Sequence, residues 1–319
     1  MLELITLDPE FHRLFNLLSV HQVMLGDELR ISRFAKAISE TVKEGDVVVD
    51  LGTGTGILAF LAVKAGAKKV YAIERNDIIN LAREVAQVNR MEDRVVFCQA
   101  DARAVQLPER ADVIISETIG HMGVAEDFLE NMAHARQHFL KTGGKLLPER
   151  MAVYVAPVEC QEAYAHIGFW NRPFCGLDFS PVVRHASSKP HIHRFRPRDL
   201  LARPSQIANL DLYAAPQLPL QAHIEFRVPT PGQLHGLAGW FKVDLTKHTQ
   251  IDTSPFSQPT HWDQTFFPAA ECRALSPGIL LRCDLMLDKI GKSYGCSWKM
   301  ALLNDERGAR ILVPQISNR

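Results

Sequence analysis

Between residues 47 and 117 the chain alternates short apolar runs with segments of helical periodicity. Four runs rich in β-branched residues predict buried strands: 47–50 (VVVD), 69–74 (KVYAIE), 94–99 (RVVFCQ) and 112–117 (DVIISE). Helices are predicted between the first three runs, at 56–67 and 76–90. The apolar face expected for the second helix consists of Ile78, Leu81, Val85 and Val88.

Successive strand–helix–strand units predict a parallel sheet with right-handed crossovers. The expected fold class is therefore α/β, with a doubly wound, mostly parallel Rossmann-like sheet. Such sheets bind ligands at the carboxyl ends of their strands, near the switch in strand order. The loops that follow the predicted strands are consequently the first place to look for a site.

Beyond Pro148 the pattern changes to one of strands joined by proline- and glycine-rich turns. Strands are predicted at 151–159, 222–229, 237–245 and 279–287, which indicates a mostly β second domain with a barrel as its expected form. The stretch 163–205 is expected to be an inserted segment and a projecting arm, without a strand. We therefore divide the chain into an N-terminal helical segment (1–46), a sheet domain (47–148) and a β-barrel domain (149–319).

Composition narrows the classes of partner. Lysine plus arginine and aspartate plus glutamate both number 36, which disfavours sequence-independent binding of nucleic acid. The six cysteines form no CxxC pair, and free thiols in a reducing compartment are expected. The start of the chain does not resemble a signal peptide, and no apolar run is long enough to span a bilayer. These features predict a soluble, cytoplasmic protein that binds neither membrane nor nucleic acid.

A glycine-rich turn follows the first predicted strand. Asp50 ends that strand, and Gly52, Gly54 and Gly56 follow in a GxGxG pattern. Glycines let the backbone take unusual dihedrals and approach a ligand closely. Ile57 stands where the dinucleotide-binding pattern has its third glycine, and no Lys-Ser or Lys-Thr follows to hold phosphate.

Acidic residues follow the next two predicted strands. Glu74 is placed to accept the hydroxyls of a ribose, and Asp101 could accept from the amino group of adenine. A glycine turn without a phosphate anchor, joined by these acids, suits S-adenosylmethionine. The alternative interpretation is a turn that serves only packing.

Two further glutamates lie in the segment 116–127 (SETIGHMGVAED). Glu117 and Glu126 are nine residues apart and have no lysine or arginine near them in the sequence, so they could hold a cationic group. Alternatively, Glu117 ends a strand and Glu126 lies in the first turn of a helix, where acidic side chains are favoured.

Four motifs together resemble the protein arginine N-methyltransferase family. They occur in the family's order: HQVMLGDELR (21–30), VDLGTGTGI (49–57), SETIGHMGVAE (116–126) and THW (260–262). The segment 168–180 (GFWNRPFCGLDFS) also resembles the start of the family's dimerisation arm. The resemblance implies a nucleoside-binding sheet domain closed by the N-terminal helices, a β-barrel with an inserted arm, and a homodimer formed through that arm.

The resemblance also implies roles for individual residues. The reaction implied is methyl transfer from S-adenosylmethionine to a guanidinium nitrogen of arginine in a protein or peptide. The catalytic residues implied are Glu117 and Glu126, which hold the acceptor, and Asp27 and His261, which assist proton loss. The cofactor-binding residues implied are His21, Met24, Arg30, Asp50, Gly52, Thr53, Gly54, Gly56, Glu74, Asp101, Ala102 and Glu117. Arg30 grips the methionine carboxylate, and Met24 stands where the asymmetrically dimethylating branch carries methionine. No metal site is expected, although His191 and His193 have a spacing found in metal sites.

Several positions depart from the family pattern, and they cluster at the acceptor. Thr118 replaces a usual tryptophan, His121 a tyrosine and Phe128 a methionine, while Phe11 and Phe15 replace tyrosines. The lost hydroxyl groups could weaken catalysis, and Thr118 should enlarge the pocket. Two alternatives follow: a methyltransferase of a small guanidino or amine metabolite, and a dimeric cofactor-binding protein without catalysis.

Overall fold

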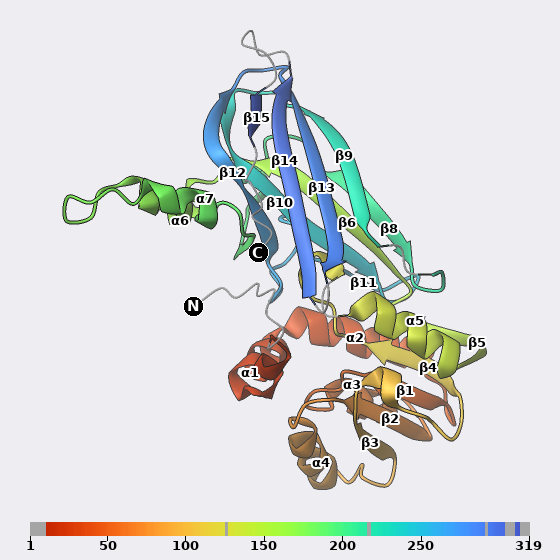
Figure 1. Ribbon diagram of the computed structural model, residues 1–319. Coiled ribbons are helices and arrows are strands. Elements are labelled where there is room, and N and C mark those ends of the chain that lie inside the picture. The colour runs from red at the N-terminus through yellow and green to blue at the C-terminus, as the bar shows by residue number, and fades with distance from the viewer. Residues whose placement is uncertain (1–10, 125–126, 216–217, 291–292, 304–309, 313–319) are drawn as a thin grey trace.

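The computed structural model describes residues 11–124, 127–215, 218–290, 293–303 and 310–312, and Figure 1 shows two parts joined by a narrow junction. The lower part in that view contains a five-stranded parallel sheet. Its strands are β1 (Val47–Leu51), β2 (Lys69–Glu74), β3 (Val95–Gln99), β4 (Ala111–Ser116) and β5 (Leu140–Leu147). The order β3-β2-β1-β4-β5 and the parallel pairing confirm the Rossmann-like class. All four strands predicted in this region are present, with ends that differ by at most one residue.

The strand order reverses between β1 and β4, because the chain leaves β1 toward β2 and β3 and then returns to pair β4 with the other side of β1. A crevice forms at such a reversal, outside the carboxyl ends of the strands. The α-helices that the structure describes in this sheet domain are α3 (Ile57–Lys64), α4 (Ile79–Val88) and α5 (Phe128–His138). Two helices precede it: α1 (Leu18–Gly26) and α2 (Glu28–Thr41).

The predicted apolar face of this helix, α4, is confirmed in part: Ile78 is 6% exposed and Val85 packs against the core, but the prediction for Val88 was wrong. Ile79, Ala82 and Ala86 are fully buried, whereas Val88 is 84% exposed. The two alanines, which come three and seven residues after Ile79, let the helix backbone lie close to the sheet. The prediction considered only the larger apolar residues, so it did not include the two buried alanines.

The upper part consists of antiparallel strands in two sheets. One sheet has the order β7-β12-β10-β6-β8, with β11 on β10, and the other has the order β15-β14-β13-β9. The strands are β6 (Arg150–Val158), β7 (His191–His193), β8 (Ser205–Asp211), β9 (Leu220–Arg227), β10 (Gly232–Asp244), β11 (Gln250–Asp252), β12 (Gln264–Leu275), β13 (Leu280–Ile290), β14 (Ser293–Leu303) and β15 (Arg310–Leu312). The predicted strands are confirmed, but in the described residues their pairing gives two barrel-like sheets in place of one closed barrel.

An arm projects from this β domain (Figure 1). The projecting arm expected for the inserted segment is therefore present, and it holds α6 (Gln161–Gly168) and α7 (Val183–Ala186), which were not predicted. The prediction that 163–205 contains no strand was wrong, because β7 pairs with β12 through Ile192 and Thr265. Its two histidines are half-buried at the root of the arm, so they do not lie on an exposed tip. Alternation of two histidines around one isoleucine was too short a pattern to reveal the strand.

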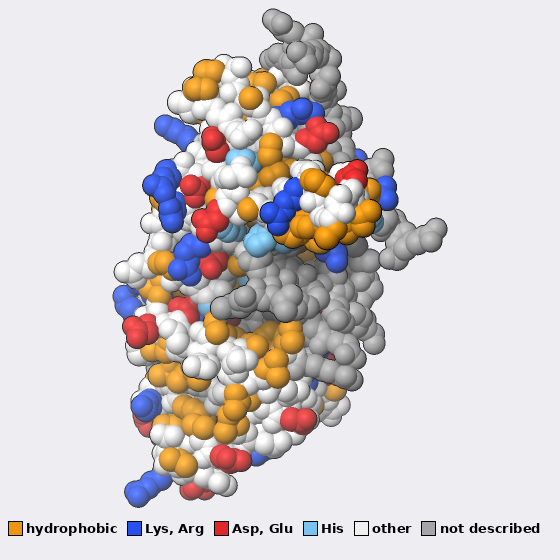
Figure 2. Space-filling view, turned by 90° about the vertical axis from the view of Figure 1, so that its left-hand side faces the viewer, with side chains coloured by type: hydrophobic (Ala, Val, Ile, Leu, Met, Phe, Trp, Pro, Cys, Tyr) orange, Lys and Arg blue, Asp and Glu red, His pale blue; other side chains and the backbone are white. Residues whose placement is uncertain are grey.

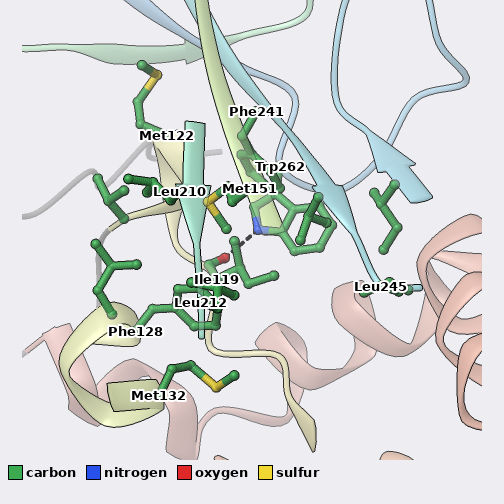
Figure 3. Close-up of a cluster of buried hydrophobic side chains, with 14 of the residues drawn as sticks. Ile119, Met122, Phe128, Met132, Met151, Leu210, Leu212, Phe241, Leu245 and Trp262 are labelled. Atoms are coloured by element: carbon green, nitrogen blue, oxygen red, sulfur yellow. Dashed lines mark hydrogen bonds between the residues drawn. The ribbon is translucent and has the colours of Figure 1, made fainter. Parts of the chain in front are cut away.

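Apolar side chains fill the junction between the two parts (Figure 3). From the sheet domain come Ile119, Met122, Phe128 and Met132, and from the β domain come Met151, Leu210, Leu212, Phe241, Leu245 and Trp262. One directed contact crosses the cluster: Trp262 Nε1 donates to the carbonyl oxygen of Ile119 at 2.6 Å. The loop after β4 and the loop before β12 are thereby fixed to each other, and both carry residues predicted to be functional.

Candidate functional site

A pocket with a cavity volume of about 120 Å³ lies at the carboxyl ends of β1 and β2. Its wall is formed by residues of α1 and α2, of the loops after β1, β2, β3 and β4, and of the first turns of α3 and α5. Phe15, which precedes α1, contributes as well. The predicted residues that line it are His21, Met24, Arg30, Gly52, Thr53, Gly54, Glu74, Asp101, Ala102 and Glu117. The structure therefore brings together residues from positions 21 to 117 at the crevice that the strand order predicts.

The glycine turn needs glycine for two different reasons. Gly52, Gly54 and Gly56 all have positive φ angles, of 70°, 52° and 89°, which L-residues with a side chain rarely adopt. At Gly56 a Cβ atom would also lie 2.5 Å from Cζ of Phe60, and at Gly52 it would collide with Cγ2 of Thr118. The turn is thus both conformationally special and closely packed against its neighbours.

Asp50 stabilises this turn from the protein interior and does not line the pocket. Its Oδ2 accepts from the Thr53 hydroxyl at 2.6 Å and from the Ala59 backbone N–H at 3.1 Å. The carboxyl group is fully buried, and burial, together with the charge of Glu74, raises its pKa to about 7. Its role is therefore to shape the loop and the first turn of α3.

Glu74 ends β2 and, unlike Asp50, bonds to the turn while also lining the pocket. One of its oxygens accepts from the Gly54 backbone N–H at 3.2 Å, and the other accepts from Asn76, from the backbone at 2.9 Å and from the side chain at 3.0 Å. The residue is 8% exposed. A carboxylate has about four acceptor sites, so Glu74 can still accept from a ligand hydroxyl.

The other end of the pocket, where Asp101 was expected to accept from the amino group of adenine, differs from the sequence prediction. We call it the base end. Asp101 accepts from Arg103 three times: Oδ1 from the backbone N–H at 2.9 Å and from Nε at 3.2 Å, and Oδ2 from Nη2 at 3.4 Å. These bonds lower the pKa of Asp101, although burial opposes them. Its acceptor capacity is largely used within the protein.

Asn131, which the sequence analysis did not single out, lines the same end of the pocket. Its side-chain oxygen is buried and has no hydrogen-bond partner in the part of the chain that the structure describes. An unsatisfied buried acceptor costs about 1–3 kcal/mol, so a donor from a ligand would be favoured here. The residue was missed because it lies in the first turn of α5, where no motif marks it.

Arg30 is the central cation of the site. It lies on α2 and is 4% exposed, and its guanidinium forms an ion pair with Glu117 and donates to the Met24 carbonyl oxygen at 2.9 Å. Its Nε has no partner among the described residues. Burial lowers the pKa of Arg30 to about 10, so the group remains a cation at neutral pH.

Asp27 connects α2 to the loop that precedes β12. It caps α2 by accepting from the Arg30 backbone N–H at 2.9 Å, and its other oxygen accepts from both the backbone N–H and Nδ1 of His261, each at 2.8 Å. Since a carboxylate only accepts, Nδ1 of His261 carries a proton and the neutral ring keeps its lone pair on Nε2. Burial lowers the pKa of His261 despite the bond to Asp27.

His21 lies beside the glycine turn rather than at the base end. Its Nε2 is 2.8 Å from the Phe15 carbonyl oxygen, and a Cβ atom on Gly54 would lie 3.0 Å from its Cε1. Phe15 lines the pocket as well. The aromatic ring that replaces a tyrosine at position 15 therefore forms part of the wall but brings no hydroxyl group.

The other departures from the family pattern have separate structural consequences. Thr118 lines the pocket and its methyl group lies against Gly52. Phe128 is fully buried in the junction core (Figure 3). Burial, together with the nearby His261, lowers the pKa of His121 to about 4, so His121 is neutral at physiological pH. Glu126 lies outside the described residues, as does the side chain of Phe11.

The sheet order and the site together define the class of protein. A parallel sheet of order 3-2-1-4-5, a glycine turn without a phosphate-binding lysine and an acidic residue after β2 are typical of nucleoside-binding methyltransferase domains. Comparison agrees: residues 149–290 match the arginine methyltransferase oligomerization subdomain, and residues 10–145 match the TRM5/TYW2 methyltransferase domain.

Known proteins resemble this chain over most of its length. Protein arginine N-methyltransferase 6 of Xenopus laevis is 32% identical over 272 residues, which cover 81% of this chain and 80% of that protein. Protein arginine N-methyltransferase 1 of Schizosaccharomyces pombe is 31% identical over 257 residues, which cover 78% and 75%. The chain belongs to the protein arginine N-methyltransferase family.

Solved structures share the fold. A chain of the Trypanosoma brucei PRMT1 enzyme–prozyme heterotetrameric complex with AdoHcy superposes with a TM-score of 0.85 at 22% identity, covering 94% of this chain and 99% of that one. Arabidopsis thaliana protein arginine methyltransferase 10 gives 0.81 at 21% identity, covering 96% and 100%. Among the described residues no helix is long and apolar enough to cross a membrane.

Proposed function

We propose that this protein is an S-adenosylmethionine-dependent methyltransferase that acts on a guanidinium nitrogen of arginine in proteins or peptides. The observation that carries the proposal is the position of Arg30. It lines the nucleoside pocket, pairs with Glu117 and lies on the same helix end as Asp27, which holds His261. Cofactor site, acceptor site and proton acceptor thus converge on one turn of α2.

The residues of the pocket suit S-adenosylmethionine. Glu74 has remaining acceptor capacity for the ribose hydroxyls, and the Arg30 guanidinium, with its unpartnered Nε, suits the methionine carboxylate. The Asn131 amide suits adenine, because it offers the acceptor and donor pair that matches an edge of that base. His21, Met24, Gly52, Gly54 and Ala102 complete the wall, while Asp50, Thr53 and Gly56 fix the turn.

S-adenosylmethionine supplies a methyl group on a positively charged sulfur, and its transfer leaves a neutral thioether. Glu117 and Glu126 hold the acceptor guanidinium, which is itself a cation, and their charges offset its repulsion from the sulfonium. A nitrogen lone pair of the acceptor forms the new N–C bond, and that nitrogen then loses one proton. Nε2 of His261 accepts the proton, with Asp27 holding the ring in the required tautomer. The role of Glu126 rests on its nine-residue spacing from Glu117.

Transfer of labelled methyl groups to mixed cell protein tests this function directly. Acid hydrolysis should release labelled methylarginines, and their symmetry shows whether Met24 accompanies asymmetric dimethylation. Glu126→Gln keeps the shape of the side chain and removes its charge, so turnover should vanish while cofactor binding persists. Retained turnover in that variant would remove Glu126 from the mechanism.

A small guanidino metabolite is the second candidate acceptor. Thr118 is a short side chain where the family usually carries tryptophan; it lines the pocket with its methyl group against Gly52, and its small size leaves more room for a different acceptor. Label transferred to free guanidino compounds, with proteins unlabelled, would support this alternative. Cofactor binding without transfer to either class would indicate a binding protein without catalysis.

The domain boundaries at 46/47 and 148/149 remain part of this proposal, with residues 1–46 closing the cofactor site. We also assign the protein to the cytoplasm, because none of its six cysteines is paired in a disulfide, as expected in a reducing compartment.

We propose a homodimer formed through the arm. The arm carries Phe169, Trp170, Phe174 and Phe179 in a cluster of ring contacts, and Phe169 and Leu177 are 42% and 63% exposed. Figure 2 shows hydrophobic side chains gathered on this arm, which points toward the viewer. Exposed apolar residues grouped in this way mark protein contacts, and the matched oligomerization subdomain supports the same interpretation.

The start of α1 offers a surface for the arm of a second copy, since Leu18 and the preceding Leu17 are 64% and 49% exposed. Sedimentation should show a dimer for the wild-type protein and a monomer for Phe169→Asp. Phe256→Asp, at a site 60% exposed and outside the arm, is the matched control and should remain dimeric. A dimeric Phe169→Asp variant would exclude the arm as the dimer contact.

A further inference from the structure

An ion cluster links the β domain to the start of α5. Lys289, near the end of β13, donates to Asp127 Oδ1 at 2.5 Å and to Glu130 Oε1 at 3.0 Å. The other oxygen of Asp127 accepts from Arg103 Nη2 at 3.3 Å. Two cations from different parts of the chain therefore hold one carboxylate.

This carboxylate is in an unusual position. Asp127 is 8% exposed and has φ 58° and ψ 18°, a left-handed conformation that aspartate tolerates better than most residues. Its carbonyl oxygen accepts from the Asn131 backbone N–H at 2.8 Å, which makes it the start of the first turn of α5. The orientation of that turn consequently depends on how Asp127 is held.

Asn131 lies one turn further along α5 and lines the base end of the pocket. The same helix packs against the 3₁₀ turn η2 (Ala102–Ala104), which contains Arg103 and follows Asp101. Both polar groups available to a base, the Asn131 amide and the Asp101 carboxylate, are therefore connected to Asp127. Asn131 is connected to Asp127 through one helical turn, and Asp101 is connected to it through Arg103, which donates to both carboxylates.

Burial makes the part of the cluster around Asp127 stronger than an ordinary surface pair. The side chains of Asp127 and Lys289 are 11% and 26% exposed, whereas those of Arg282 and Glu225, an ion pair between β13 and β9, are 50% and 49% exposed. Burial opposes the charge of Lys289, yet its bonds to Asp127 and Glu130 hold its pKa above the usual value. The ion pair is thus preserved across the physiological range, and water screens it less than the outer pair.

We propose that Lys289 is a positioning residue for the base end of the nucleoside pocket, acting from the β domain through Asp127 and the first turn of α5 on Asn131. The inference rests on the proposed function, since it assumes that this pocket takes an adenosyl ligand. It assigns to the β domain a part in cofactor selection, in addition to any part in binding the acceptor.

Calorimetry with two ligands tests the inference. S-adenosylhomocysteine and S-inosylhomocysteine differ at the base edge, where the amino group of the first is replaced by an oxygen in the second. Lys289→Met should weaken binding of the adenosyl ligand by about five- to tenfold, at the low end of typical couplings between sites. Binding of the inosyl ligand should change less, so the preference for adenosine falls. Asp127→Asn should have the same effect, and Lys289→Arg should restore the wild-type preference.

Arg282→Met is the matched control, because it removes an ion pair on the same strand that does not reach α5. It should leave both affinities unchanged. Equal weakening of both ligands in Lys289→Met would show a general structural role and overturn the positioning role, as would unchanged binding. If the wild-type protein bound neither ligand, the proposed function itself would fail, which is a distinct result.

Discussion

Arg30 and Glu117 form a buried ion pair between α2 and the loop after β4, with side chains that are 5% and 7% exposed. One of these residues is assigned to the cofactor and the other to the acceptor. Neither charge could remain buried alone at low cost, since an uncompensated charge in the interior is strongly unfavourable. The pair therefore explains how the protein keeps both groups in place before any ligand binds.

Removing one member of this pair should destabilise the protein strongly. Arg30→Met leaves the Glu117 carboxylate buried without its partner, and the free energy of unfolding should fall by about 3–5 kcal/mol. Urea denaturation at pH 7 measures the change. The double variant Arg30→Met/Glu117→Leu removes both charges and should be more stable than the single variant. If the loss in the double variant equalled the sum of the losses in Arg30→Met and Glu117→Leu, the two charges would not be coupled.

Backbone conformation and packing can be separated at two glycines. Gly45 and Gly56 have nearly the same φ, 88° and 89°, but a Cβ atom has open space at Gly45 and meets the Phe60 ring at Gly56. Gly45→Ala should cost about 1–2 kcal/mol, the cost of a left-handed L-residue. Gly56→Ala should cost about 1–3 kcal/mol more, as overpacking does. Chemical denaturation of both variants gives the comparison, and equal losses would show that Phe60 moves aside freely.

Sequence patterns predicted the elements of this fold better than their faces. The four β-branched runs of the sheet domain stand out because parallel strands are buried on both sides. The face of α4 was misplaced in part, because Ala82 and Ala86 are buried whereas the larger Val88 is exposed. Strand β7 was missed because three residues are too few for a periodic signal and only its pairing with β12 defines it.

The candidate site shows the same limit at the level of side chains. Motifs indicated Arg30, Asp27 and His261, and the structure brings them together although over two hundred residues separate the last from the others. Asn131 could not be found in this way, because an asparagine within a helix has no distinguishing pattern. Nor could the sequence show that the Arg103 side chain donates to the Asp101 carboxylate, since that bond depends on the conformation of one short turn.

Asp50 should make stability depend on pH. Burial raises its pKa in the folded protein to about 7, whereas the unfolded value is near 3.8. The folded state therefore holds a proton that the unfolded state releases, and the contribution to stability is present below pH 4 and is lost as the pH rises to about 7. Asp50→Asn cannot titrate at this position. The unfolding free energy of the wild type, measured relative to that of the variant, should therefore fall between pH 5 and pH 8. Urea midpoints at the two pH values measure this shift, and a constant difference would show that Asp50 stays ionised.

The pair of Asp27 and His261 should determine the acid limb of activity. His261 must be neutral at Nε2 to accept a proton, and burial holds its pKa below 6.5, so turnover should be lost only as the pH falls below that value. The bond to Asp27 raises the pKa of His261 against this trend. Asp27→Asn retains an acceptor for the helix cap but removes the charge, so the acid limb should move to lower pH.

The maximal rate of Asp27→Asn should fall as well, by about tenfold to a hundredfold, because the amide can also turn its NH₂ group toward Nδ1 and favour the wrong tautomer. Profiles of kcat against pH for wild type and variant separate the two effects. His223, whose ring pairs with Asp284 on the exposed surface of the β domain, gives the control variant His223→Asn with an unchanged profile. An acid limb that stays in place in Asp27→Asn would assign it to another group, and His261 would then not be the proton acceptor.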